Sequence, residues 1–154
     1  MHRHFLIASA LFVVCLAASP ATAQESRADA SLSWSTWSED DRTAPGWTAS
    51  AAFYPSRRVG VVWDFGRYHN LPLDFHMGGV RIRFPHRRVT PFVQFLAGRA
   101  PFDDFAFQPG GGVDLHFHRH LAARVAADVK VSGDDGSTYV AKRFSAGLVV
   151  SIGR

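Results

Sequence analysis

The chain has 154 residues, of which 47% are hydrophobic, 13% aromatic and 19% charged, with one cysteine and a formal net charge of +4. This composition is too apolar for a disordered protein, and a single cysteine excludes a disulfide framework or a cysteine-based zinc site. No apolar run beyond the N-terminal segment approaches the ~20 residues that a helical membrane span requires. The length without that segment suits one domain.

Residues 1–23 are organised like a secretory signal peptide. A basic start is followed by an apolar run and by a small-x-small tripeptide that ends at Ala23. A signal peptidase accepts this pattern, so we predict cleavage after Ala23 and export of the protein. Cleavage removes Cys15 and leaves a short tail over 24–30, followed by one domain over 31–154.

The exported part alternates between apolar and polar residues, with no helical periodicity. Period-two alternation is typical of strands with two different faces. The alternation is clear in five segments, 47–54, 58–66, 111–118, 121–131 and 143–153, and weaker in three, 31–37, 74–84 and 89–98. Within 74–84 the phase changes at Gly78-Gly79, which predicts a β-bulge that puts Phe75 and Met77 on the same face as Val80.

The connections between these eight segments alternate in length. Three are short, 55–57, 85–88 and 119–120, and four are longer and polar, 38–46, 67–73, 99–105 and 132–142. Short periplasmic turns and longer outer loops are typical of outer-membrane barrels. We therefore predict an all-β protein with a single eight-stranded, antiparallel, up-and-down transmembrane β-barrel.

The polar face of the strands carries charges of both signs, with small residues between them. This mixture fits the narrow lumen of a small barrel better than a surface in water. The predicted lumen network has a structural role and consists of Arg58, Asp64, Arg81, Arg83, Asp114, His116, Arg124, Asp128 and Lys130. A soluble, lipocalin-like carrier with the apolar face inside remains the alternative.

Aromatic residues on the apolar face gather near the strand ends. Such clusters are typical of the two aromatic girdles at the membrane–water interfaces. The predicted girdle residues are Trp47, Phe53, Phe65, Phe75, Phe84, Phe117 and Phe144.

The chain from Gly46 to Gly153 resembles the small OmpA-like outer-membrane β-barrel domain of bacterial proteins. The stretches that carry the resemblance are 60–66, 91–98, 110–115, 120–124 and 144–148. The resemblance implies an outer-membrane location but no particular activity, because such domains include structural and adhesive proteins. It also implies a final aromatic residue for the assembly machinery, whereas this chain has Ile152 as its last outward residue and ends at Arg154.

The histidines are the strongest candidates for catalysis. His116 and His118 are two residues apart, so both point into the barrel and could bind a metal ion or act as a base. They lie near a predicted turn and have no convincing serine partner, so we predict neither a catalytic nor a metal site, and no cofactor. The acidic run at Asp134-Asp135 lacks the further ligands of a calcium loop.

The preferred function is therefore a non-enzymatic integral outer-membrane protein with a plugged polar lumen and a structural or surface-interaction role. The alternatives are the soluble carrier of an apolar ligand, a lipid-A-modifying barrel enzyme and a narrow pore. The expected partners are outer-membrane lipids, which the basic turns contact, periplasmic chaperones and the barrel-assembly machinery. We expect a monomer that binds no nucleic acid.

Overall fold

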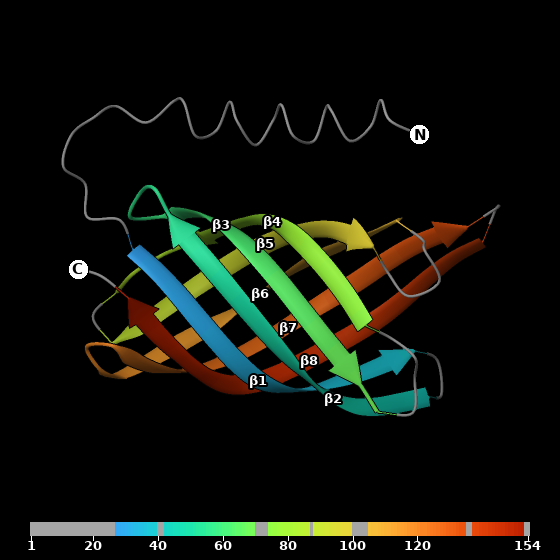
Figure 1. Ribbon diagram of the computed structural model, residues 1–154, viewed down its shortest axis with the longest axis horizontal. Helices are drawn as coiled ribbons and strands as arrows, with labels where there is room; N and C mark the ends of the chain where they lie inside the picture. Colours follow the sequence, from blue (N-terminus) through green and yellow to red (C-terminus); the bar gives the residue numbers. More distant parts are fainter. Residues whose placement is uncertain are drawn as a thin grey trace.

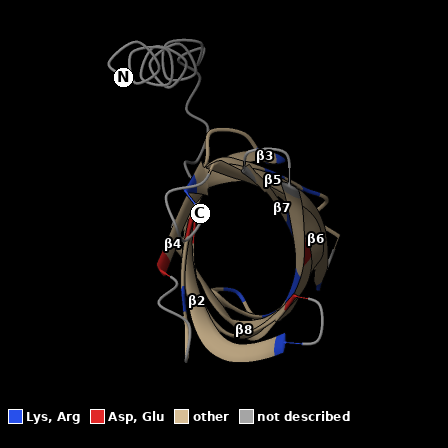
Figure 2. Cartoon of the chain, turned by 90° about the vertical axis from the view of Figure 1, so that its right-hand side faces the viewer, with Lys and Arg blue, Asp and Glu red and all other residues tan. Residues whose placement is uncertain are grey.

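A computed structural model describes residues 27–39, 42–69, 74–86, 88–99, 105–134 and 137–152. Eight strands form one closed barrel in which every strand is antiparallel to its neighbours and the last strand pairs with the first (Figure 1). Seen along its axis, the sheet is an oval ring (Figure 2). In the described part of the chain, no helix is long and apolar enough to cross a membrane. The predicted signal peptide, 1–23, lies outside the described residues.

The strands follow one another around the ring in chain order. Their bounds are β1 Arg27–Glu39, β2 Arg42–Tyr54, β3 Val59–Tyr68, β4 Asp74–Arg83, β5 Val89–Arg99, β6 Phe105–His118, β7 Leu121–Asp134 and β8 Ser137–Ile152. We call the end with connections 55–58, 84–88 and 119–120 the turn end, and the opposite end the loop end. The predicted eight-stranded up-and-down barrel is thus the observed fold.

The two faces of the sheet differ as the alternation predicts. The outer face presents large apolar side chains, such as Trp63 and Leu148, whereas charged and small residues point inward. A barrel with an apolar cavity would place these two sets the other way round. The inward charges therefore exclude the lipocalin-like arrangement.

The connections at the loop end are shorter than expected. The predicted loop 38–46 is mostly strand, because β1 continues to Glu39 and β2 begins at Arg42; the predicted loop 132–142 is likewise replaced by the ends of β7 and β8. These segments contain small and polar residues on both faces, which hides the alternation. Backbone pairing continues through them nonetheless, and the β7–β8 hairpin extends furthest at the loop end (Figure 1).

Strand β1 also begins earlier than predicted. Residues 27–30 pair with β2, so the expected tail over 24–30 overlaps the barrel. This extension brings Asp29 into the sheet, with its side chain buried inside.

The predicted bulge at Gly78-Gly79 is wrong. Strand β4 pairs in continuous register with both neighbours. Its inward residues are Phe75, Met77, Gly79 and Arg81, so Phe75 is not a girdle residue: its side chain is 1% exposed and lies inside the barrel. The outward position next to Phe75 is therefore occupied by the polar residue His76, whose side chain is exposed.

Gly66 on β3 provides the space that the Phe75 ring needs. A Cβ at Gly66 would collide with that ring and approach the Thr48 side chain. The ring stacks on Tyr68, with 5.9 Å between the centroids. The inward ring of Phe75 therefore fits because its neighbour on β3 is a glycine.

This packing predicts that Gly66→Ala destabilises the barrel. The added methyl group would displace the Phe75 ring within a filled lumen, which we expect to lower the free energy of unfolding by about 1–3 kcal/mol. Urea unfolding in detergent micelles, monitored by the mobility of unboiled protein on gels, measures this change.

The matched control is Gly78→Ala. Its Cβ would meet only the Val62 carbonyl oxygen, at 3.9 Å, so we expect a change within about 0.5 kcal/mol. The double variant Gly66→Ala, Phe75→Ala should lose less free energy of unfolding than the sum of the losses in the two single variants. If Gly66→Ala and Gly78→Ala lowered the free energy of unfolding equally, the assignment of Phe75 to the lumen would be contradicted.

Candidate functional site: a charged network in the lumen

The lumen contains every buried charged side chain of the described residues. Each lies on an inward position, and they come from six of the eight strands: Asp29, Asp64, Arg81, Asp114, Arg124, Asp128, Lys130 and Arg143. Four carboxylates are thus balanced by three guanidinium groups and one ammonium group. A set of charges away from water needs this balance, because an uncompensated buried charge is very costly.

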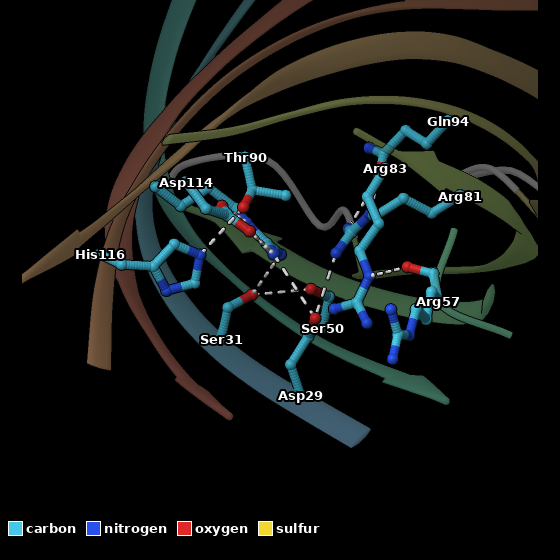
Figure 3. Close-up of polar contacts among 11 residues, drawn as sticks. Asp29, Ser31, Ser50, Arg57, Arg81, Arg83, Thr90, Gln94, Asp114 and His116 are labelled. Carbon is cyan, nitrogen blue, oxygen red and sulfur yellow. Dashed lines mark hydrogen bonds and ion pairs between the residues drawn. The ribbon is translucent and has the colours of Figure 1, made fainter. Parts of the chain in front are cut away.

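The part of the network nearer the turn end is centred on Arg124. Its Nε and Nη2 donate to the two carboxylate oxygens of Asp114 at 2.7 and 2.8 Å, a two-bond pairing between direct cross-strand neighbours. The same guanidinium group donates to Ser31 Oγ at 3.3 Å. The Asp29 carboxylate lies 3.8 Å from Arg81 (Figure 3) and 3.8 Å from Arg124. The β1 carboxylate therefore links β4 and β7 across the lumen.

The part nearer the loop end is centred on Arg143. Its Nε and Nη2 donate to Asp128 Oδ2 at 2.9 and 2.7 Å. Its Nη1 donates to Asp64 Oδ2 at 2.5 Å, across the barrel from β8 to β3. One arginine thus neutralises two carboxylates on strands that are not adjacent to each other.

Gln94 joins the two parts. Its Oε1 accepts hydrogen bonds from Nε and Nη2 of Arg81 at 3.0 and 2.7 Å, and its Nε2 donates to Asp128 Oδ1 at 2.8 Å. The bond to Asp128 passes over β6 at Gly110, the cross-strand partner of both residues. A Cβ at Gly110 would collide with Asp128 Oδ1, so this bond needs the glycine.

Aromatic rings fill the space beside the cations. Phe92 lies under the guanidinium groups of both Arg81 and Arg124, at 4.6 and 4.9 Å from the ring centroid. The ammonium group of Lys130 lies 4.8 Å from the Trp37 ring. Such contacts stabilise desolvated cations and leave less room for solvent.

Most of the predicted lumen residues lie together in this network. Asp64, Arg81, Asp114, Arg124, Asp128 and Lys130 are all buried inside. Arg83 lies at the turn end, where its guanidinium group stacks on Tyr54 at 3.8 Å and its Nε donates to the Arg57 carbonyl oxygen. His116 is half-buried, with Nε2 3.2 Å from Thr90 Oγ1.

Arg58 does not belong to the network. The predicted strand began at residue 58, but β3 begins at Val59, and Arg58 is an exposed residue of the preceding turn. Counting every second residue from the strand would place Arg58 inward, but this count does not apply because the chain is not extended at residue 58.

Three residues of the network were absent from the predicted set. Arg143 and Gln94 occupy inward positions of predicted strands, so alternation alone could have added them. Asp29 could not be found in this way, because it fell in the predicted tail.

The remaining predicted girdle residues lie on the outer face. Phe53, Phe84, Phe117 and Phe144 are exposed, and Trp47 and Phe65 are partly exposed and contact each other at 5.3 Å between the centroids. Outward aromatic residues therefore occur near both ends of the barrel.

The histidines at the turn end contact one another and the backbone. Within the described ranges, no group of three or more potential ligands could hold a metal ion. His118 and His120 contact each other at the turn end, with 6.1 Å between the ring centroids, and His120 Nδ1 lies 3.2 Å from the Ser151 carbonyl oxygen. These contacts stabilise a turn.

Solved structures with the same fold are small transmembrane barrels. A de novo designed transmembrane β-barrel matches with a TM-score of 0.60 at 12% identity, over 80% of this chain and 95% of the design. Neisserial surface protein A matches with a TM-score of 0.55 at 14% identity, over 82% and 98% of the two chains. The N-terminal β-barrel domain of Pseudomonas aeruginosa OprF matches with a TM-score of 0.56 at 13% identity, over 80% and 97%.

No protein-family model and no curated protein sequence matches the chain. At these identities the solved structures show the fold alone. The chain has the fold of eight-stranded transmembrane β-barrels, with a charge-balanced lumen and an apolar outer face.

The network predicts that Arg143→Met is strongly destabilising. The substitution leaves Asp64 and Asp128 buried without the guanidinium group that neutralises them, so we expect a loss of about 3–5 kcal/mol in the free energy of unfolding. Urea unfolding in detergent micelles measures it.

Lys142→Met on the neighbouring, exposed position is the control, with an expected change within about 0.5 kcal/mol. The triple variant Arg143→Met, Asp64→Asn and Asp128→Asn should recover much of the loss, because it removes the buried charges together. A triple variant less stable than Arg143→Met would show that the pairing is not the source of the effect.

Proposed function

We propose that the protein is a non-enzymatic integral outer-membrane protein of the OmpA-like type, with a plugged lumen and a structural or surface-interaction role. The observation that carries this proposal is the distribution of polarity in the barrel. Large apolar side chains cover the outside, and the charges inside neutralise one another. This arrangement suits a hydrocarbon surrounding and would be unstable in water.

The predicted export signal over 1–23 supports an outer-membrane location, because exported barrels of this kind insert there in bacteria with two membranes. The chain's partners on this proposal are outer-membrane lipids, and during assembly the periplasmic chaperones and the barrel-assembly machinery. The fold neighbours include a natural barrel described as a surface protein, which agrees with the proposal.

The bonding of the network supports a plugged lumen. The chain of contacts from Asp114 through Arg124, Asp29, Arg81 and Gln94 to Asp128 crosses the lumen between strands. Movement of an ion along the axis would require these bonds to break. We therefore favour a structural role over a pore.

A lipid-modifying enzyme is the less favoured alternative. His116 and His118 are the predicted candidates for its base, and the His116 ring contacts the hydroxyl group of Thr90 rather than a serine activated next to an acid. No observation favours this activity over the structural role.

The location is tested by expressing the full chain in a bacterium with two membranes. We expect the protein in the outer-membrane fraction, and faster migration of the unboiled sample on a gel, because closed barrels resist detergent unfolding. Recovery as a soluble periplasmic protein would contradict the proposal.

The plug is tested by recording from purified protein in planar lipid bilayers. Wild type is expected to give no stepwise conductance, whereas Arg81→Ala, which removes the guanidinium group between Asp29 and Gln94, is expected to leak ions. Arg67→Ala, on an exposed position near the loop end, should remain silent. Regular conductance steps in wild type would show that the lumen is open.

A further inference from the structure

The three connections at the turn end are basic. They contain Arg57, Arg58, Arg87, Arg88 and Arg119 and no acidic residue. In the sequence, the four segments between the other consecutive strands contain no lysine or arginine; three of them contain aspartates, and the segment between β3 and β4 contains no charged residue. The up-and-down topology therefore places all the arginines of the connections at the turn end.

Two of the cations on the strands near the loop end have acidic neighbours. Arg67 forms an ion pair with Asp74 at 3.7 Å, and Arg42 is the cross-strand partner of Glu39. At the turn end, by contrast, Asp29 and Asp114 are buried in the lumen network. The exposed arginines there, Arg57, Arg58, Arg88 and Arg119, form what we call the basic collar.

Each part of the basic collar follows an outward aromatic residue. Phe53 precedes Arg57 and Arg58, Phe84 precedes Arg88, and Phe117 precedes Arg119. All three phenylalanines are exposed on the outer face, with between 45% and 65% of their surface accessible. A ring at the edge of the hydrocarbon followed by a cation a few residues further on matches the order of acyl chain and phosphate in a lipid leaflet.

Hydrogen bonds within the turns fix the backbone that carries these arginines. Ser56 Oγ accepts a hydrogen bond from the Val59 amide at 2.9 Å, and Arg83 Nε donates to the Arg57 carbonyl oxygen at 2.9 Å (Figure 3). The His86 and Val89 backbones bond each other, and the Ser151 amide donates to the His120 carbonyl oxygen. Anchored turns hold the cations at defined places, which lowers the entropy lost on binding.

We propose that the basic collar binds the phosphate groups of anionic phospholipids in the leaflet beside the turn end. This inference rests on the proposed membrane location and adds a lipid class and a site to it. A lipid leaflet fits better than a soluble acidic polymer, because the arginines follow exposed aromatic residues in all three turns. Arginine is suited to phosphate through its two-bond geometry.

The test uses the full barrel reconstituted in phosphatidylcholine vesicles with spin-labelled lipids. Electron spin resonance gives the association of spin-labelled phosphatidylglycerol relative to spin-labelled phosphatidylcholine. We expect wild type to prefer phosphatidylglycerol, and the preference to fall to a ratio of about one at ~1 M salt, where the Debye length is about 3 Å. The variant Arg57→Gln, Arg58→Gln, Arg88→Gln and Arg119→Gln should show the same fall at low salt.

The matched control removes four exposed cations near the loop end, with Arg42→Gln, Arg67→Gln, Arg99→Gln and Lys142→Gln. It should retain most of the preference for phosphatidylglycerol. An equal loss of this preference in both variants would overturn the proposal that the basic collar binds anionic phospholipids. A wild type that inserts but shows no preference would also overturn it. So would binding of the collar to a soluble acidic cell-wall polymer without lipid selectivity. Failure of wild type to insert into any vesicle would instead contradict the proposed membrane location.

Discussion

Neutralisation of charge inside a barrel whose outer face is apolar is the constraint on which the rest of this structure depends. Side chains alternate between the two faces of a strand, so a sequence that turns its apolar residues outward must turn its polar residues inward. Eight strands leave a lumen only wide enough for those side chains. The buried charges therefore have to balance one another, and four aspartates stand against three arginines and one lysine. The amide of Gln94 bonds to both Arg81 and Asp128.

The same constraint explains where the small residues lie. An inward ring or a long polar side chain needs an empty position on the next strand, as at Gly66 beside Phe75 and at Gly110 beside Asp128. The glycine and its large neighbour lie on different strands, so neither predicts the other without the register. At these places the lumen is thus packed by pairs of neighbouring residues, one with a large side chain and one a glycine.

Alternation predicted the strand number, the topology and most of the inward residues, because the period of two survives wherever outward residues contact lipid. The prediction failed where the outer face of the strands is no longer apolar. Beyond the apolar belt β1, β2 and β7 continue with mostly small and polar residues, and on β8 the exposed residues Tyr139 and Val140 follow one another without alternation, so the ends of these strands were predicted as loops. It failed again at Phe75, because an aromatic residue on an inward position looks like an outward one. The cross-barrel contact between Arg143 and Asp64 could not be predicted, since it depends on the barrel diameter and strand stagger as well as on parity.

The place of Asp29 has a consequence for how the barrel closes. Strands β6, β7 and β8 can pair Asp114 with Arg124, and Asp128 with Arg143, while the sheet is still open, because these residues are direct cross-strand partners. Asp29 on β1 contacts Arg81 on β4 and Arg124 on β7, which lie in opposite directions around the ring from β1. Both contacts can hold at the same time only when β1 is paired with β2 and with β8. Closing the ring therefore brings one carboxylate to two arginines on distant strands.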